Sequence, residues 1–420
     1  MSTFERSVKQ FSQRLTQQTK RIMSLFQNNT NETPHQILML GGRRSGKSSI
    51  LASIVYSLDN YANLFTMNDQ TDYSIKDGLG IPLSEKRIEI DNYLRKHKSS
   101  PKNSRFLVDM SPNKGEGIYH LETQIQGKAK VTFEFVDVSG ENMEVTSEHH
   151  ARLKEHVKKS DVFIVAIDTP YLMQDDNENI NTVWNRTDEI TNLLSNITIA
   201  DENLDKKLII FCPVKCEKWT QSGQAEKVTE RVCKAYRKLI NNWVHHSAVD
   251  LWVMPIETAG GLVHSKLLDG YELFRNAQDK TGEMCSINDQ TGQIMLKDGM
   301  LLQPSDNYTI SDKPSEKLLF SATQIPLSWY TVNGKGFSPA KCEQPALHVL
   351  RFLVRKEENL MRSEGLNMSL LKRIWIWLTT WAPPFGKELK AYGELIDKLE
   401  NNHLIKNTGD GFANIIDYVS

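Results

Sequence analysis

Several features that the 420-residue sequence lacks exclude or disfavour whole classes of protein. No apolar run reaches the roughly 18 residues that a membrane-spanning helix requires, and the first residues contain no apolar segment typical of a secretory signal. The five cysteines are odd in number and form no C-x-x-C pair, which disfavours a disulfide framework and a zinc site. A formal net charge of −1 gives no electrostatic reason to expect nucleic-acid binding. We therefore expect a soluble, cytoplasmic globular protein.

A glycine-rich segment at 41–49, Gly-Gly-Arg-Arg-Ser-Gly-Lys-Ser-Ser, carries the strongest signal. It follows an apolar run at 36–40, typical of a buried strand, and precedes a run at 50–56 with helical apolar spacing. A strand, Gly-x-x-x-x-Gly-Lys-Ser and a helix form the context of a phosphate-binding P-loop. The glycines let backbone amides turn inward as an anion nest, and the helix directs its positive end to the same place. We expect Lys47 to reach the β- and γ-phosphates and the Ser48 hydroxyl to ligate Mg²⁺. The residues expected to contact phosphate here are Gly41, Gly42, Arg43, Arg44, Ser45, Gly46, Lys47, Ser48 and Ser49.

A second group of polar residues ends a predicted hairpin. Alternating apolar runs at 118–125 and 131–136 predict two paired strands, and Asp137 follows the second. In a P-loop sheet this strand lies beside the P-loop strand, so Asp137 would hold the metal through a water. The backbone of Gly140 would approach a γ-phosphate. The alternative interpretation of Asp-x-Ser-Gly is an ordinary turn.

Beyond the hairpin, strands and helices alternate. The predicted strands are 162–167, 208–212 and 251–254, and the predicted helices lie near 142–159, 181–197 and 225–244. This alternation predicts an α/β fold with a mainly parallel sheet and helices on both faces.

The chain divides into five predicted parts. These are an N-terminal amphipathic helix and linker at 1–34, an α/β core at 35–270, a β-rich insertion at 271–340, the last core helix at 341–365 and a C-terminal helical extension at 366–420. The N-terminal helix has a basic face, and three tryptophans lie within 370–381. Either segment would suit a membrane surface or a partner, although packing on the protein's own core is the simpler interpretation.

The P-loop together with Asp-x-x-Gly after a hairpin strand resembles the TRAFAC class of P-loop GTPases, which includes Ras-like and translation GTPases. That class reads the base through [Asn/Thr]-Lys-x-Asp and a later Ser-Ala turn, and the segments 214–217 and 257–260 occupy these positions. The resemblance implies a Ras-like G domain in which Lys215 lies along the base and Glu217 accepts guanine's N1–H and N2–H₂. Thr258 and Ala259 would form the base turn. Val214 and the longer Glu217 depart from the class pattern, so adenine remains an alternative to guanine.

The segments 211–219 and 342–345 are similar to the bacterial double-GTPase group, whose members tend to sit in multi-gene conflict or defence systems. The resemblance implies a GTP/GDP-binding protein that acts as a nucleotide-gated switch on a protein partner from the same operon. Ras-like members have a glutamine where this chain has Glu141, so Glu141 would orient the attacking water or act as a weak base, and we expect slow Mg²⁺-dependent hydrolysis. Since the chain has one P-loop, any pairing would involve another subunit or gene product. The rival hypotheses are a P-loop ATPase or kinase, a non-hydrolysing nucleotide-binding scaffold and a membrane-remodelling GTPase. The pattern singles out no switch residue.

Overall fold

The structure is a computed structural model of the chain. It describes residues 34–42, 45–58, 66–68, 88, 92, 106–107, 116–125, 129–138, 140–143, 150–174, 178–199, 205–275, 285–287, 294–296, 308–313, 316–367 and 385–419. The predicted N-terminal helix, the tryptophan-rich segment at 370–381, Arg43 and Arg44 lie outside these residues.

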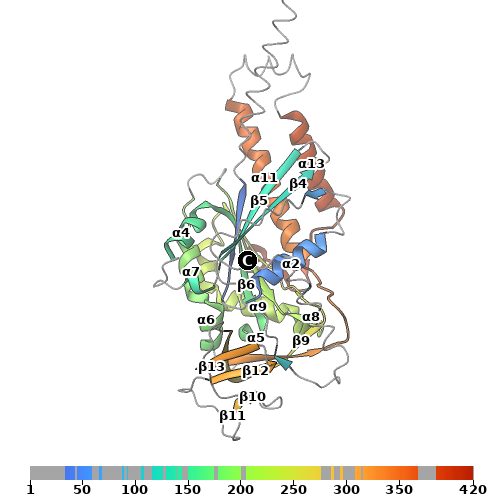
Figure 1. Cartoon of the computed structure of the whole chain (residues 1–420). Helices are drawn as coiled ribbons and strands as arrows, with labels where there is room; N and C mark the ends of the chain where they lie inside the picture. Colours follow the sequence, from blue (N-terminus) through green and yellow to red (C-terminus); the bar gives the residue numbers. More distant parts are fainter. Residues whose placement is uncertain are drawn as a thin grey trace, which may run out of the picture.

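Within the described residues, a nine-stranded sheet forms the centre of the fold (Figure 1). Its strands, in spatial order, are β14 (Thr408–Gly409), β15 (Phe412–Asn414), β8 (Val249–Val253), β7 (Lys207–Val214), β6 (Ser160–Asp168), β1 (His35–Leu40), β5 (Ala129–Val138), β4 (Glu116–Ile125) and β2 (Thr66–Asn68). The five strands from β8 to β5 are parallel, and the two flanking pairs are antiparallel. The predicted β4–β5 hairpin is confirmed, and β5 lies directly beside β1. This is an α/β P-loop NTPase fold, as the sequence predicted.

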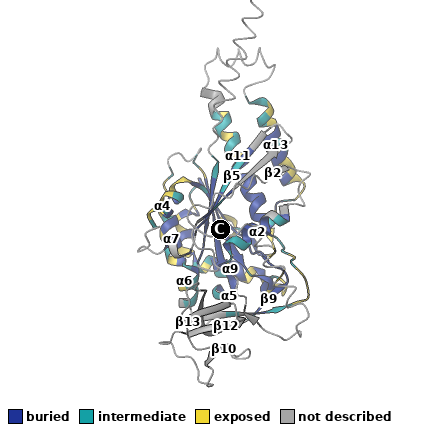
Figure 2. Ribbon diagram, viewed as in Figure 1, coloured by how far each residue is buried: buried dark blue, intermediate teal, exposed yellow. Residues whose placement is uncertain are grey.

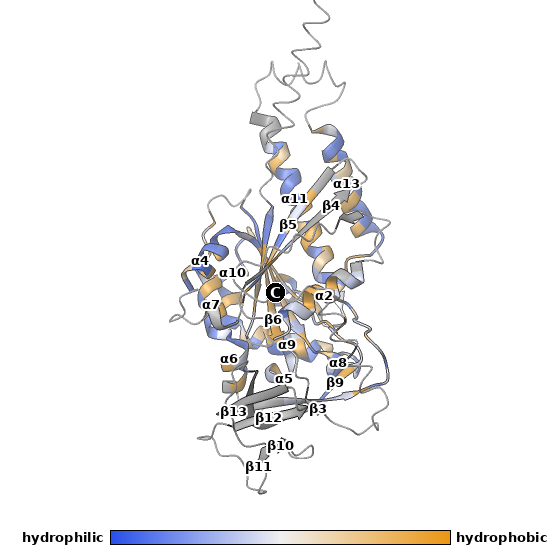
Figure 3. Cartoon of the chain, viewed as in Figure 1, coloured by the Kyte–Doolittle hydropathy of each residue, from blue (hydrophilic) through white to orange (hydrophobic). Residues whose placement is uncertain are grey.

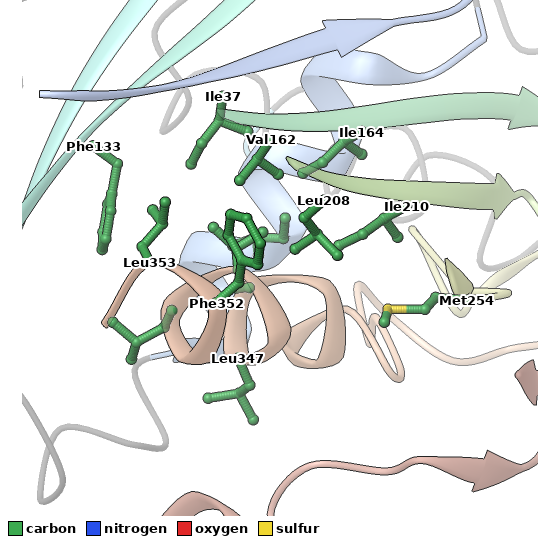
Figure 4. Packing of buried hydrophobic residues seen from close by; sticks show 14 of the residues in the cluster. Ile37, Phe133, Val162, Ile164, Leu208, Ile210, Met254, Leu347, Phe352 and Leu353 are labelled. Carbon is green, nitrogen blue, oxygen red and sulfur yellow. The ribbon is translucent and has the colours of Figure 1, made fainter. Parts of the chain in front are cut away.

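The central strands are apolar on both faces, so helices cover both faces of the sheet. Ile37 and Met39 belong to one core, whereas Leu38 and Leu40 belong to the other, because successive side chains point to opposite faces. Figure 4 shows the first core, where Phe352 packs near strand residues such as Ile37. Its helices are α2 (Lys47–Leu58), α11 (Glu343–Asn367) and α13 (Gly386–Asn401). The second core is covered by α4 (His150–Lys159), α7 (Thr187–Ser195), α9 (Ala225–Ala235) and α10 (Arg237–Trp243).

Burial and hydropathy follow the same layers. Figure 2 shows the buried residues along the central strands and the inner sides of the helices, and Figure 3 shows hydrophilic residues on outer helices such as α4. Among the described helices, none combines the length and the apolar character needed to span a bilayer.

Two predicted helices are each divided in two. The helix predicted at 181–197 is α6 (Glu178–Asn185) followed by α7, because Arg186 adopts a left-handed φ of 55° between them. The helix predicted at 225–244 is α9 and α10, separated at Tyr236. Of the helix predicted near 142–159, the structure describes α4 from His150 and the short 3₁₀ helix η2 (Gly140–Met143), whereas residues 144–149 lie outside the described residues. Apolar spacing continues through such breaks, so periodicity alone does not reveal them.

The β-rich part is organised around one long antiparallel pair, β9 (Leu262–Arg275) with β13 (Glu316–Val332). β12 (Tyr308–Lys313) and β3 (Phe106–Leu107) also pair with β13, and β10 (Cys285–Ile287) pairs with β11 (Ile294–Leu296). β9 begins before the predicted boundary at 271. The C-terminal part contains the β14–β15 hairpin, which joins the main sheet beside β8, as well as α13 and α14 (Ile415–Val419). The sequence had predicted only helices there, and strands of two and three residues are too short to show a period.

A charged cluster joins β1 to α11 at the amino end of the sheet. His35 lies 2.8 Å from Asp161 through Nδ1 and 2.7 Å from Glu357 through Nε2. Lys207 and Lys356 contact Asp161 as well. Burial lowers the pKa of His35, but the hydrogen bonds with the two carboxylates outweigh burial and raise the pKa to about 9. The imidazolium is therefore the form that the folded protein favours.

We expect the stability that His35 contributes to be present in full below pH 6.5 and to be lost as pH rises through 9, because its folded pKa is the higher one. The shift corresponds to at most about 3 kcal/mol. Urea unfolding at pH 6 and pH 9.5 checks this, and His35→Gln should flatten the difference. An equal pH dependence in the variant and the parent protein would contradict this role.

Candidate functional site

The loop between β1 and α2 is shaped by close backbone approaches. A Cβ on Gly41 would lie 2.6 Å from the Ala166 carbonyl oxygen, and one on Gly42 would lie 1.9 Å from the Trp184 carbonyl oxygen. Gly46 has a φ of 94°, which side chains disfavour, and its carbonyl accepts the first bond of α2 from Ile50 at 2.9 Å. The loop therefore fits between β6 and α6 only with glycine at these positions.

Lys47 lies beneath this loop. Its side chain is buried, and Nζ donates hydrogen bonds to the carbonyl oxygens of Gly41 at 3.0 Å and Gly42 at 3.1 Å. Burial lowers the pKa of Lys47, and the charge of Asp137 opposes that effect. The ammonium is thus held within the loop, close to the acid at the end of the neighbouring strand.

Ser48 and Asp137 are brought together from the first turn of α2 and the end of β5. The Ser48 hydroxyl donates to Asp137 Oδ2 at 2.6 Å, and the register places Asp137 beside Met39 of β1. Hydroxyl and carboxylate oxygens suit Mg²⁺, which takes few protein ligands and completes its shell with water and phosphate oxygens. Among the described residues, no group of three or more His, Cys, Asp or Glu is arranged so that it could hold a metal ion. The donor set therefore fits a phosphate-bound Mg²⁺ better than a metal held by protein alone.

The other predicted phosphate-site residues are placed unevenly. Gly140 is buried and begins η2, and Ser49 is half-buried on α2. The side chain of Glu141, like Arg43 and Arg44, lies outside what the structure describes. Ser45 Oγ is buried and has no hydrogen-bond partner among the described residues.

The predicted base-binding residues converge after β7 and β8. Glu217 begins the short helix α8 (Glu217–Thr220), and its Oε1 accepts hydrogen bonds from the amides of Ala259 and Gly260, each at 3.1 Å. Burial raises the pKa of Glu217 to about 7, although these backbone amides oppose the shift. Lys215 precedes it with a left-handed φ of 58°. Glu217 therefore holds the base turn that contains Thr258 and Ala259.

Further contacts tie this turn to α2 and α8. Ser53 of α2 donates to the Thr258 carbonyl oxygen at 2.8 Å. The Glu257 carboxylate accepts hydrogen bonds from Thr220 Oγ1 at 2.8 Å and Gln221 Nε2 at 2.9 Å. The buried Ser53–Thr258 contact thus connects this turn to α2, and the partly buried Glu257 contacts connect it to α8 and Gln221.

Sequence reasoning missed three residues of this region. Ser53 contacts Thr258 and Trp184 approaches Gly42, and no local sequence pattern predicts either contact. Asp168 ends β6 and forms an ion pair with Lys215. A signal for it did exist, since Asp168 ends a buried strand in the same manner as Asp137.

Comparison with known proteins gives limited information. No family model matches the chain, and no curated protein matches its sequence. The Ski7 GTPase-like domain of S. cerevisiae, bound to GDP and inorganic phosphate, is similar with a TM-score of 0.32 and 11% identity, covering 72% of each chain. The same domain bound to GTP is similar with a TM-score of 0.31 and 11% sequence identity, and the match covers 73% of this chain and 72% of that chain. Because these similarities are weak, the fold assignment rests on the strand order and the P-loop.

Proposed function

We propose that the chain binds a guanine nucleotide with Mg²⁺ and hydrolyses GTP slowly. The observation that carries this proposal is the 2.6 Å contact between Ser48 and Asp137, beside the Lys47 ammonium held in the glycine loop. A buried cation, a helix N-terminus and two oxygen groups, one on the first turn of α2 and one near the end of β5, suit one ligand class, a polyphosphate with a hard divalent cation. A glycine turn with a purely structural role gives no reason for this grouping.

Each residue then has a role. Ser48 would hold Mg²⁺ directly and Asp137 through a water, and the bound ion supplies neutralisation of phosphate charge. Lys47 would stabilise charge on the β- and γ-phosphates, and the Gly140 amide would approach the γ-phosphate. Glu141 takes the place of the glutamine that Ras-like members use to orient water.

Slow hydrolysis follows from the charge of Glu141. An anion near a γ-phosphate is unfavourable unless positive charge offsets it. Arg43 and Arg44 of the loop would supply only part of this positive charge. We expect a protein partner from the same operon to raise turnover, and we propose a nucleotide-gated switch, in keeping with the resemblance to the double-GTPase group.

The preference for guanine is assigned to Glu217. Its carboxylate form accepts two donors, which guanine presents at N1 and N2, whereas adenine presents an acceptor at N1. Because the pKa of Glu217 is raised to about 7, only part of the protein carries the carboxylate form of Glu217 near neutral pH.

We therefore expect the ratio of GDP to ADP affinity to rise about tenfold between pH 6 and pH 8, because Glu217 ionises across this range. Because GDP and ADP carry the same diphosphate, the effect of phosphate titration on affinity cancels in this ratio. Calorimetric titration at both pH values measures it, with Glu217→Gln expected to make the ratio nearly independent of pH. A constant ratio in the parent protein would argue against Glu217 as the base reader.

The rival hypotheses are separated by two measurements. In the first, GDP and ADP are each titrated against a bound fluorescent nucleotide. Displacement of this nucleotide by a lower concentration of ADP than of GDP would favour the ATPase. Phosphate release under saturating GTP is compared among the parent chain, Lys47→Ala and Asp137→Ala. Equal release from all three would favour a non-hydrolysing scaffold.

A further inference from the structure

Asp168 is fixed in place by its backbone. It ends β6 opposite Val214 of β7, and its side chain is buried. Its amide donates to Asn185 Oδ1 at 2.7 Å, and Asn185 Nδ2 donates to its carbonyl oxygen at 3.2 Å. Asn185 is itself fully buried and is held by Asn181 at 2.8 Å. The carboxylate therefore has a defined position at the carboxyl edge of the sheet.

Lys215 reaches this carboxylate from the turn after β7. Its ammonium pairs with Asp168 Oδ2, while its backbone adopts the left-handed conformation that lysine rarely takes. Burial raises the pKa of Asp168, and the charge of Lys215 opposes the shift. Both ends of the Lys215 side chain are thus constrained, one by the turn and one by the ion pair, and the four-carbon stem extends between them.

The pair shares its surroundings with Glu217 and an aromatic wall. Burial raises the pKa of Tyr330, and the nearby charges of Asp168 and Glu217 raise it further. The His264 ring of β9 stacks on Trp219 with a ring-centroid distance of 5.6 Å. It meets the Tyr330 ring of β13 edge-on, with a centroid distance of 5.8 Å. The long β9–β13 pair therefore contributes one side of the region assigned to the base.

We propose that Asp168 is a positioning residue for nucleotide binding, which anchors Lys215 so that its stem forms an apolar platform for one face of a purine base. This rests on the proposed function, and it deepens the assignment of the base site. Methylene groups present apolar surface without hydrogen-bonding groups, so the platform does not distinguish one purine from another. Glu217 would discriminate guanine from adenine, and the Asp168–Lys215 pair would contribute affinity for either purine base.

The test uses the full chain with Mg²⁺ and three probes: GDP, IDP, which lacks the guanine N2 amine, and inorganic tripolyphosphate, which has no base. Asp168→Asn is expected to weaken GDP and IDP by the same factor, about tenfold, since it removes a charge-assisted hydrogen bond. The GDP/IDP ratio and tripolyphosphate affinity should stay at their parent values. The exposed acid Asp188 on α7 provides a control, and Asp188→Asn should change none of the three.

Lys215→Met gives the same test if Asp168→Asn fails to fold, and it should show the same loss. Where both fold, the double variant should bind GDP about as well as either single one, because both remove the same interaction. Unchanged GDP affinity, an altered GDP/IDP ratio, an equal loss of tripolyphosphate or additive effects in the double variant would each overturn the inference while leaving the proposed function in place. A parent chain that binds no nucleotide would overturn both.

Discussion

Lys47→Ala is expected to weaken binding of GTP with Mg²⁺ at least about 100-fold, because it removes a buried charge that would face the phosphates of a bound nucleotide. The Lys47 ammonium lies within hydrogen-bond distance of two loop carbonyl oxygens, at 3.0 and 3.1 Å. A polyphosphate in the loop would meet this charge where the protein already compensates its burial with carbonyl dipoles. Phosphate release should fall with binding, since the same charge stabilises the transferring phosphoryl group.

Calorimetry of GTP binding and a phosphate-release assay measure the two effects. Lys154→Ala on the exposed side of α4 is the matched control, and it should behave as the parent chain does. Lys47→Arg keeps the charge but not the compact shape, so it should recover only part of the affinity. If Lys47→Ala binds GTP as tightly as the parent chain, the loop does not serve as a phosphate site.

The second large effect concerns Mg²⁺. Ser48→Ala and Asp137→Asn are each expected to raise the Mg²⁺ concentration needed for half-maximal GTP binding by about 10- to 100-fold. The first would remove a direct metal ligand, and the second would weaken the group that orients a metal-bound water. The two oxygens already contact each other at 2.6 Å, so the site requires little rearrangement. Ser48→Ala should have the larger effect of the two.

A Mg²⁺ titration of GTP binding measures this directly. Asp188→Asn, on the exposed side of α7, makes the same chemical change away from the loop and should leave the Mg²⁺ dependence unchanged. Variants that bind GTP more weakly at every Mg²⁺ concentration, with the half-maximal concentration unaltered, would separate these residues from the metal.

The parts of the site that could be predicted are those encoded by neighbouring residues. The glycine loop lies between an apolar strand and an apolar helix in the sequence, so its place at the end of β1 followed from adjacency. Asp137 could be placed because parallel strands end at the same edge of a sheet, and the hairpin identified its strand as the neighbour of β1.

The remaining features depend on distant pairings. Asp168 meets Lys215 because β6 and β7 align Asp168 with Val214, and that register is not visible in the sequence. Glu217 was predicted to face a base, yet its contacts with the Ala259 and Gly260 amides follow from the path of the chain after β8. Similarly, Trp184 approaches Gly42 close to the helix break at Arg186, and apolar spacing reveals neither the approach nor the break.

Titration of GTP into the purified chain with excess Mg²⁺ tests the central claim most directly. The account predicts saturable binding to one site per chain, weakened by EDTA and outcompeted by GDP more effectively than by ADP. The absence of measurable affinity for both GTP and ATP in the presence of Mg²⁺ would contradict it.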